Sequence, residues 1–287
     1  LKRDVLRRSN IGLLYTRRME TGEGGVGPGQ TLGVDGLYSL STSLNVNGYF
    51  AATTGNTHES RRKNRSHHLA FDYSADRYGF QAQHLAVGTN FNPQVGFLRR
   101  TDFKRSFAQA RFSPRPSRDH WKSIRRFVYQ TNIEYIENNA GRIDFREQEA
   151  QFLIEQVNGD QLNVDFTRDY EFIPREFEIS QKIFVPVGGY TFNNLLTSYT
   201  LGQRRFLSGS VSFQQGQLYG GTKRSIGLSG GRMELSSQLA LEPSVSINWV
   251  RLPFGDFTQS VITERTTYTI SPRMFVSALT QYASGSR

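Results

Sequence analysis

The amino-acid sequence predicts an all-β protein, because apolar and polar residues alternate along several stretches of the chain. In residues 127–135 every second residue is aromatic, aliphatic or β-branched, while Gln130, Asn132 and Glu134 lie between them. The same alternation returns in residues 161–166 and 244–249. Successive side chains of a strand point to opposite faces, so each stretch is typical of a strand with one apolar and one polar face.

Short turn sequences separate these stretches and predict hairpins. Residues 138–141 read Asn-Asn-Ala-Gly, residues 158–160 read Asn-Gly-Asp, and glycine pairs stand at 188–189 and 230–231. Tight turns of this kind join neighbouring antiparallel strands, which favours an up-and-down order. About sixteen strands are predicted, over residues 10–19, 31–41, 43–54, 66–75, 77–87, 101–112, 123–137, 141–156, 160–170, 176–185, 190–201, 203–214, 218–229, 233–250, 259–270 and 273–283.

Two architectures can accommodate so many strands with one apolar face. A soluble sandwich or propeller turns the apolar faces inward, whereas a membrane barrel turns them towards lipid. Hydrophobic residues make up 37% of the chain and the mean hydropathy is −0.52, so no stretch approaches the roughly 18 apolar residues of a spanning helix. A barrel tolerates this low hydropathy, since only alternate residues face lipid. We therefore expect an antiparallel up-and-down transmembrane β-barrel.

Residues 1–287 are predicted to form a single domain, since no shift in composition marks a boundary. The chain starts without the apolar core of a signal peptide. Residues 284–287 also lack the terminal aromatic strand that barrel assembly signals generally need. We expect a fragment of a longer protein, with the final strands missing.

The composition excludes several kinds of chemistry. The chain has no cysteine, which excludes disulfides, thiol nucleophiles and thiolate zinc sites. Its net charge of +10 is compatible with nucleic acid, anionic lipid or anionic solutes. The basic residues gather in loops rich in proline, glycine, asparagine and serine, and no motif for reading bases is present, so we expect no nucleic-acid partner.

No catalytic residue, cofactor site or metal site is predicted. His67 and His68 are adjacent, and neighbouring residues of a strand point to opposite faces. Glu147 and Glu149 share one face of a strand, which suits either a glycosidase cleft or charges on a polar wall, and the wall is the simpler interpretation.

Two connections could constrict a lumen or attract anions. Residues 88–100 crowd amides, aromatic residues and two arginines together, and residues 115–126 are strongly basic. Such loops could fold inward, although asparagine and proline are also ordinary turn formers. The residues that we expect to act in this way are Asn90, Asn92, Arg99, Arg100, Arg115, Arg118, Arg125 and Arg126.

The order of several short motifs resembles a Gram-negative outer-membrane β-barrel domain family of unknown function, which follows a DOMON-like, family-nine carbohydrate-binding module. The motifs are residues 88–100, 111–116, 174–179, 185–190, 218–221, 252–257 and 281–282. The resemblance implies an N-terminal carbohydrate-binding module in the full-length protein and gives no catalytic residue to carry over. Members of the family continue past the Gln281-Tyr282 motif with further strands, so the resemblance implies that strands beyond this segment take part in closing the barrel.

Together these observations favour a barrel of the bacterial outer membrane that acts as a pore or in transport of carbohydrate-derived or anionic solutes. Its expected surroundings are outer-membrane lipid and lipopolysaccharide. The alternative is a soluble carbohydrate-active or carbohydrate-binding β-protein of the cell envelope, which would use a carboxylate pair and aromatic platforms.

Overall fold

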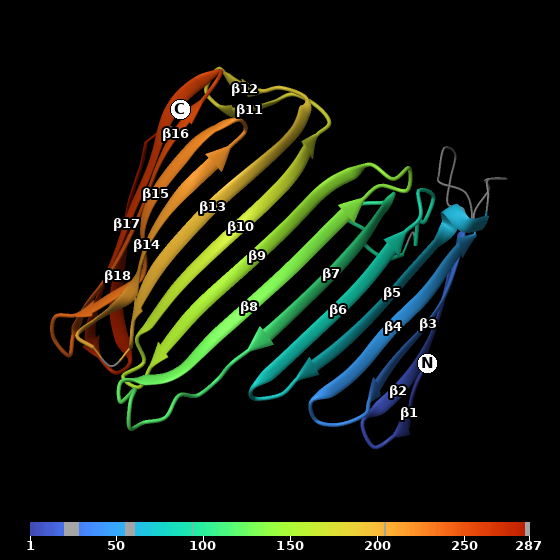
Figure 1. Ribbon diagram of the computed structural model, residues 1–287, viewed down its shortest axis with the longest axis horizontal. Helices are drawn as coiled ribbons and strands as arrows, with labels where there is room; N and C mark the ends of the chain where they lie inside the picture. The colour runs from blue at the N-terminus through green and yellow to red at the C-terminus, as the bar shows by residue number, and fades with distance from the viewer. Residues whose placement is uncertain (20–28, 55–60, 94, 204, 285–287) are drawn as a thin grey trace. The chain divides into compact units, whose positions relative to one another are not determined.

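The computed structural model describes residues 1–19, 29–54, 61–93, 95–203 and 205–284 and is all-β (Figure 1). It consists of a sixteen-stranded sheet, a separate two-stranded hairpin and one 3-10 turn, η1 (Arg61–Asn64). The strands are β1 (Lys2–Leu6), β2 (Ser9–Arg18), β3 (Gly29–Ser39), β4 (Leu44–Thr54), β5 (Arg65–Ser74), β6 (Tyr78–Val87), β7 (Phe103–Phe112), β8 (Ile124–Glu137), β9 (Ile143–Gln156), β10 (Gln161–Ile173), β11 (Phe177–Ser180), β12 (Ile183–Val185), β13 (Gly188–Leu201), β14 (Leu207–Leu218), β15 (Gly221–Glu234), β16 (Leu239–Leu252), β17 (Gly255–Ser271) and β18 (Met274–Ser284).

The strands of the large sheet follow one another in chain order. β1 to β10 are succeeded directly by β13 to β18, and every strand pair whose register is resolved is antiparallel. This order confirms the predicted all-β, antiparallel up-and-down fold with sixteen strands in the sheet.

The predicted and observed sheets both have sixteen strands, but only because two errors in the predicted strands cancel. Residues 176–185 are not one strand of the sheet: they form the β11–β12 hairpin, which turns at Lys182 (φ 60°) where the backbone N–H donates to Glu178 Oε1 at 2.6 Å. The sheet instead contains β1, whose five residues are too few to show an alternating pattern.

The chain divides into two compact units. Unit 1 comprises Leu1–Arg111 and Asn132–Arg146, and unit 2 comprises Phe112–Thr131 and Glu147–Arg287. The described residues contain no helix that is long and apolar enough to span a membrane.

In unit 1 the register sorts side chains onto two different faces. Leu13 is opposite Val34, which is opposite Phe50, so these apolar residues share one face. One position away along the chain, Asp35 is opposite Tyr49 and Tyr49 is opposite His68. Paired residues of neighbouring strands lie on the same face, so unit 1 has an apolar face and a polar face.

Unit 2 shows the same division in a longer row. A single line of paired residues crosses seven neighbouring strands, and every member is apolar or aromatic: Leu162, Tyr199, Val211, Leu228, Val245, Ile262 and Tyr282. The adjacent line on the other face begins Asn163, Ser198 and Ser212. The apolar line is not covered, since Val211 is 53% exposed and Ile262 is 44% exposed.

Candidate functional site

The candidate site is the polar face of the sheet, together with the segments that fold over it. The polar face is the face of Asp35 and His68 in unit 1, and of Asn163 and Ser212 in unit 2. It carries a crossing segment in unit 1, and an acidic patch and a hairpin in unit 2.

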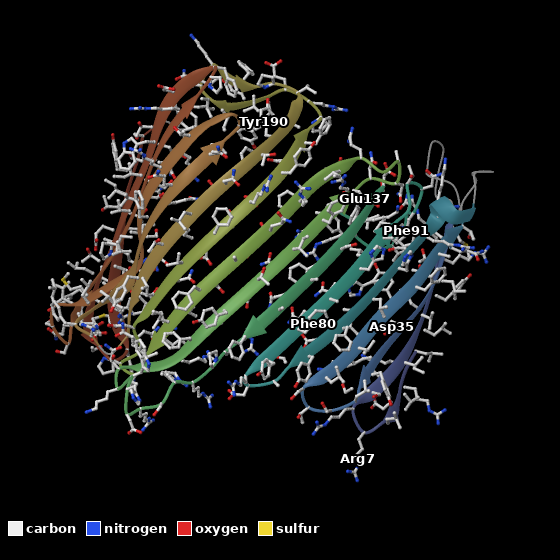
Figure 2. The ribbon with its side chains drawn as sticks, in the orientation of Figure 1. Arg7, Asp35, Phe80, Phe91, Glu137 and Tyr190 are labelled. Atoms are coloured by element: carbon white, nitrogen blue, oxygen red, sulfur yellow. The ribbon has the colours of Figure 1, made fainter. Side chains whose placement is uncertain are left out.

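Residues 88–93 fold back across the polar face of unit 1. The segment leaves β6, yet the carbonyl oxygen of Pro93 accepts a hydrogen bond from Thr31 Oγ1 of β3 at 3.2 Å. The Asn92 N–H lies 3.4 Å from Thr53 Oγ1 of β4. Because β4 and β5 separate β6 from β3, the segment crosses the sheet on its polar side. Phe91 is buried there (Figure 2).

The predicted residues Asn90 and Asn92 belong to this crossing segment. The Asn90 N–H donates to the Lys63 carbonyl oxygen at 2.9 Å, so backbone bonds fix both residues in place. The segment therefore crosses the polar face within unit 1, where backbone groups and threonine hydroxyls anchor it; that it constricts a lumen stays a prediction.

The other end of the same connection is held near the turn between β8 and β9. Asp102 accepts hydrogen bonds from Asn139 Nδ2 at 2.9 Å and from Thr89 Oγ1 at 2.8 Å. These bonds, of which the Asn139 bond has the largest effect, hold the pKa of the Asp102 carboxyl below its ordinary value.

The two predicted arginines of this connection differ in their surroundings. Arg100 forms an ion pair with Asp144, which also pairs with Arg142 at 3.0 Å. Arg99 is exposed and makes no ion pair with the described residues. Arg99 is therefore the arginine whose charge is available to a solute.

Three of the four predicted arginines of residues 115–126 come together in unit 2. Arg115, Arg118 and Arg125 line one hollow with Ile124 and Val157. Arg126 is bound elsewhere: its guanidinium forms two bonds to the Glu155 carboxylate, at 2.5 and 3.1 Å. The hollow is thus basic, while the charge of Arg126 is neutralised.

An acidic patch on the polar face of unit 2 was not predicted. Asp165 and Asp169 of β10 lie on this face, and Glu149 of β9 is near enough to act electrostatically on both. Asp165 is only 8% exposed; one of its oxygens accepts a hydrogen bond from Asn163, and the other has no partner among the described residues. The side-chain oxygen of Asn194 is also buried without a described partner.

The sequence did contain a signal for this patch. Positions 163, 165, 167, 169 and 171 of β10 are all polar or acidic and lie two residues apart, so they share a face. The sequence alone does not show that Glu149 of β9 adds to them.

The β11–β12 hairpin covers the end of the polar face of unit 2, beside the ends of β13 and β16 (Figure 1). Phe177 of β11 packs edge-on against Tyr219 in the turn between β14 and β15, with ring centroids 5.7 Å apart. Ile183 of β12 lies over Gly255 at the start of β17, where an added Cβ would come within 3.0 Å of it. The hairpin therefore reaches from the end of β10 to β17.

Tyr219 is the centre of this contact. Tyr190 and Phe192 also pack edge-on against its ring, each with centroids 5.2 Å away (Tyr190 is labelled in Figure 2). Its hydroxyl donates to Glu171 Oε2 at 3.1 Å, and burial beside that carboxylate raises the pKa of Tyr219 to about 12. The residue has a left-handed backbone (φ 42°), which usually costs about 1 kcal/mol or more for a side chain of this kind.

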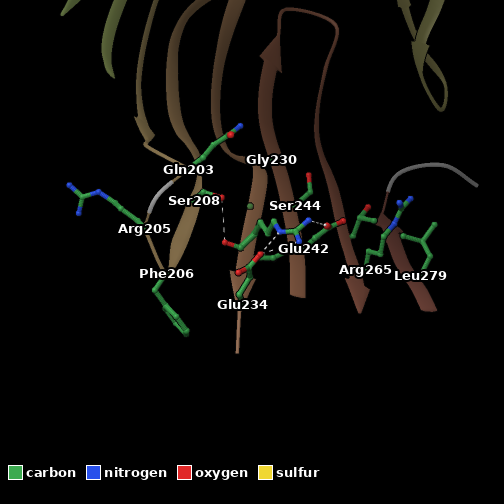
Figure 3. A pocket seen from close by; sticks show the side chains of 14 residues that line it. Gln203, Arg205, Phe206, Ser208, Gly230, Glu234, Glu242, Ser244, Arg265 and Leu279 are labelled. Atoms are coloured by element: carbon green, nitrogen blue, oxygen red, sulfur yellow. Dashed lines mark hydrogen bonds and ion pairs between the residues drawn. The ribbon is translucent and has the colours of Figure 1, made fainter. Parts of the chain in front are cut away.

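A further hollow in unit 2 contains a group of charges at the opposite end of the strands (Figure 3). Arg232 binds Glu234 at 3.1 Å and Glu242 at 3.3 Å. Arg265 lines the same hollow and forms no ion pair with the described residues. Among the described residues, the hollow therefore places one unpaired cation, Arg265, beside a cluster of one arginine and two carboxylates.

Comparison with known proteins gives no relative: no protein-family model matches the chain, and no curated protein is significantly similar to it. The resemblance to the outer-membrane barrel family that follows a carbohydrate-binding module therefore stays a prediction.

Proposed function

We propose that the chain is a transmembrane β-barrel of the bacterial outer membrane that acts as a pore or in transport, with its apolar face against lipid. The observation that carries this proposal is the row from Leu162 to Tyr282, in which seven neighbouring strands present apolar side chains on one uncovered face. Lipid-facing strands of membrane barrels have this pattern.

The alternative of a soluble carbohydrate-active β-protein requires a second layer over that row. Soluble monomers rarely expose continuous apolar patches larger than a few hundred Å². Phe213 and Trp249, on the same face as the row, are 46% and 41% exposed. A membrane accounts for this exposure without an additional layer.

The polar face would then line an aqueous passage. The crossing segment of residues 88–93 and the β11–β12 hairpin both lie on this face, each within its own unit, and each would narrow the passage. Selection would depend on the size and charge of the solute, and no bond chemistry is involved.

The polar face favours a hydroxyl-rich solute. Its rows in unit 2 include many serine, asparagine, glutamine and carboxylate side chains, which exchange hydrogen bonds readily with sugar hydroxyls. The carboxylates of Asp165 and Asp169 would repel an anion from the acidic patch of unit 2. Arg99 and the hollow of Arg115, Arg118 and Arg125 would attract an anion. We therefore favour carbohydrate-derived solutes over simple anions, consistent with a carbohydrate-binding module as neighbouring domain.

The test is fractionation of the expressed protein followed by electrophoresis in detergent with and without heating. A barrel is recovered with the outer membrane and migrates as a compact species that heating converts to a slower one. Recovery as a soluble monomer without detergent would overturn the proposal, and a screen of glycan binding and hydrolysis would then address the alternative.

A further inference from the structure

The apolar face of unit 2 changes its chemistry at one edge. The paired residues Phe166 and Leu195 on β10 and β13, and Trp249 on β16, lie just before this edge, and Tyr170 and Phe172 follow on the same face of β10. Towards the turn between β14 and β15, three arginines follow on the same face: Arg168 two residues beyond Phe166, Arg224 opposite Trp249, and Arg251 two residues beyond Trp249. We call these three residues the arginine belt.

The belt arginines have no carboxylate partner in the part of the chain that the structure describes. All three are exposed, and none forms an ion pair with the described residues. Asp256 is opposite Arg251 in the register, yet the two side chains do not form an ion pair. Arg100, Arg105, Arg126, Arg205 and Arg232, in contrast, each bind a carboxylate. Three unpaired guanidinium groups on one face favour an external anion.

Amide groups and an aromatic ring accompany the belt. Arg224, Arg251 and Trp249 line one hollow with Asn193 and Gln217. Asn193 donates from its backbone N–H and its side chain to Gln217 Oε1, at 3.0 and 2.9 Å, which leaves the Gln217 Nε2 group to donate to a ligand. The hollow therefore combines cations, an available amide donor and apolar side chains with one carboxylate, that of Asp256.

The opposite edge of this apolar face lacks cations. From β13 to β18, the residues there that share the apolar face include Leu241, Pro243, Glu264 and Thr266, and no lysine or arginine of the described strands joins them. Unit 1 has an unpaired cation on its apolar face as well: Arg65 lies over the ring of Phe50, 5.8 Å from its centroid. The cations thus mark one edge of the apolar face of unit 2, as expected where lipid chains meet charged headgroups.

We propose that the arginine belt binds the phosphate groups of a phosphorylated glycolipid in the membrane leaflet at this edge, with the acyl chains lying along Trp249, Phe166 and Leu195. The guanidinium fork matches phosphate oxygens in a two-point geometry that an ammonium group does not offer. This inference rests on the proposed membrane location, since it needs lipid against the apolar face. It also orients the protein, with the turn between β14 and β15 on the glycolipid side.

The experiment is native mass spectrometry of the detergent-purified protein with added diphosphorylated lipid A, compared with lipid A from which the phosphates have been removed. The variant carries R168Q, R224Q and R251Q. We expect the wild type to bind the phosphorylated probe in preference, and the variant to bind it at least about tenfold more weakly, since each lost charge-assisted bond weakens binding. A second variant with lysine at the three positions keeps the charge and should bind at an intermediate level.

A control variant distinguishes the effect of the belt arginines from a general effect of removing positive charge. Arg265 lies on the polar face, outside the hollow of the belt, and forms no ion pair with the described residues. R265Q should leave lipid binding unchanged. If the wild type and the triple glutamine variant bind lipid A equally, and both are heat-modifiable, the proposal that the belt binds glycolipid would be wrong. The proposal of a membrane barrel would still hold. A wild type that is soluble without detergent would overturn both proposals.

Discussion

Asp160 and Arg205 form a two-point ion pair that joins the turn after β9 to the connection between β13 and β14. Arg205 Nη2 lies 2.5 Å from Asp160 Oδ2, and Arg205 Nε lies 3.0 Å from Oδ1. The Gly202 N–H and the Tyr199 hydroxyl donate to the same carboxylate at 2.8 and 2.9 Å. Asn158 Nδ2 donates to the carboxylate as well, at 3.0 Å. Asp160 has no exposed surface, so five donors satisfy a carboxylate that water cannot reach.

Replacing Asp160 by asparagine should destabilise the fold in a pH-dependent way. The Arg205 bonds, with the Gly202 N–H, hold the pKa of the Asp160 carboxyl far below its ordinary value. The ion pair therefore stabilises the protein above the unfolded carboxyl pKa of about 4, and this contribution is lost as the pH falls further. The temperature at which the compact electrophoretic species disappears should be lower for D160N than for wild type at pH 7, and the difference should shrink at pH 3. D119N, in an exposed loop, is the control, and an equal loss with that variant would contradict the prediction.

Adjacent residues of β14 test which face meets lipid. Phe213 lies on the apolar face and Gln214 on the polar face. If the apolar face is in lipid, F213R should cost about 2 to 4 kcal/mol near the bilayer centre, whereas Q214R should cost little. The measurement is the unfolding free energy in vesicles or detergent from a urea titration. Equal costs for the two arginines would argue against a lipid-facing sheet.

Tyr219 should contribute a stability change at high pH. Its folded pKa of about 12 exceeds the ordinary value of 10.0, so the folded state keeps the phenol proton that the unfolded state loses. Stability from this group is complete below about pH 10 and is lost as the pH rises towards 12. Y219F should remove this alkaline change and, at neutral pH, cost about 1 to 2 kcal/mol for the lost bond to Glu171. Y38F, at an exposed tyrosine, should leave the alkaline profile as in wild type.

The acidic patch should favour cations if unit 2 lines a passage. Neutralising Asp165 and Asp169 together with asparagine keeps the size of both side chains and removes two negative charges from the polar face. The ratio of cation to anion permeability, measured from the reversal potential of a planar bilayer under a salt gradient, should fall. D119N again serves as the control, and an unchanged ratio in the double variant would remove the patch from the conduction path.

Much of the sheet could be predicted because most strands show the alternation of apolar and polar residues within their own sequence. The alternation of residues 161–166 and 244–249 assigned both strands and also their faces, since Val164 and Ile247 lie on the apolar face as the pattern requires. A pattern of period two needs no knowledge of the partner strand.

The β11–β12 hairpin could not be predicted in the same way. Residues 176–185 alternate as a spanning strand does, and only Pro174 and Pro186 at the borders suggested an interruption. What separates the hairpin from the sheet is its contact with Tyr219 and Gly255, which are distant in sequence.

The Asp160–Arg205 pair and the acidic patch were missed for a related reason. Asp160 was assigned to a hairpin turn, which it does occupy, but its partner is 45 residues away. Glu149 and Asp165 approach one another only after the register of β9 and β10 is fixed. The charges that act together therefore depend on strand neighbours, which local alternation does not specify.

The seven-strand apolar row also restricts how the length of the chain can vary. A one-residue insertion in β14 just before Val211 would exchange the faces of all later side chains of the strand and turn Val211 away from the row to which it contributes. Two inserted residues would restore the original faces. Natural variants of this protein should therefore differ in strand length by even numbers, with odd changes confined to the turns.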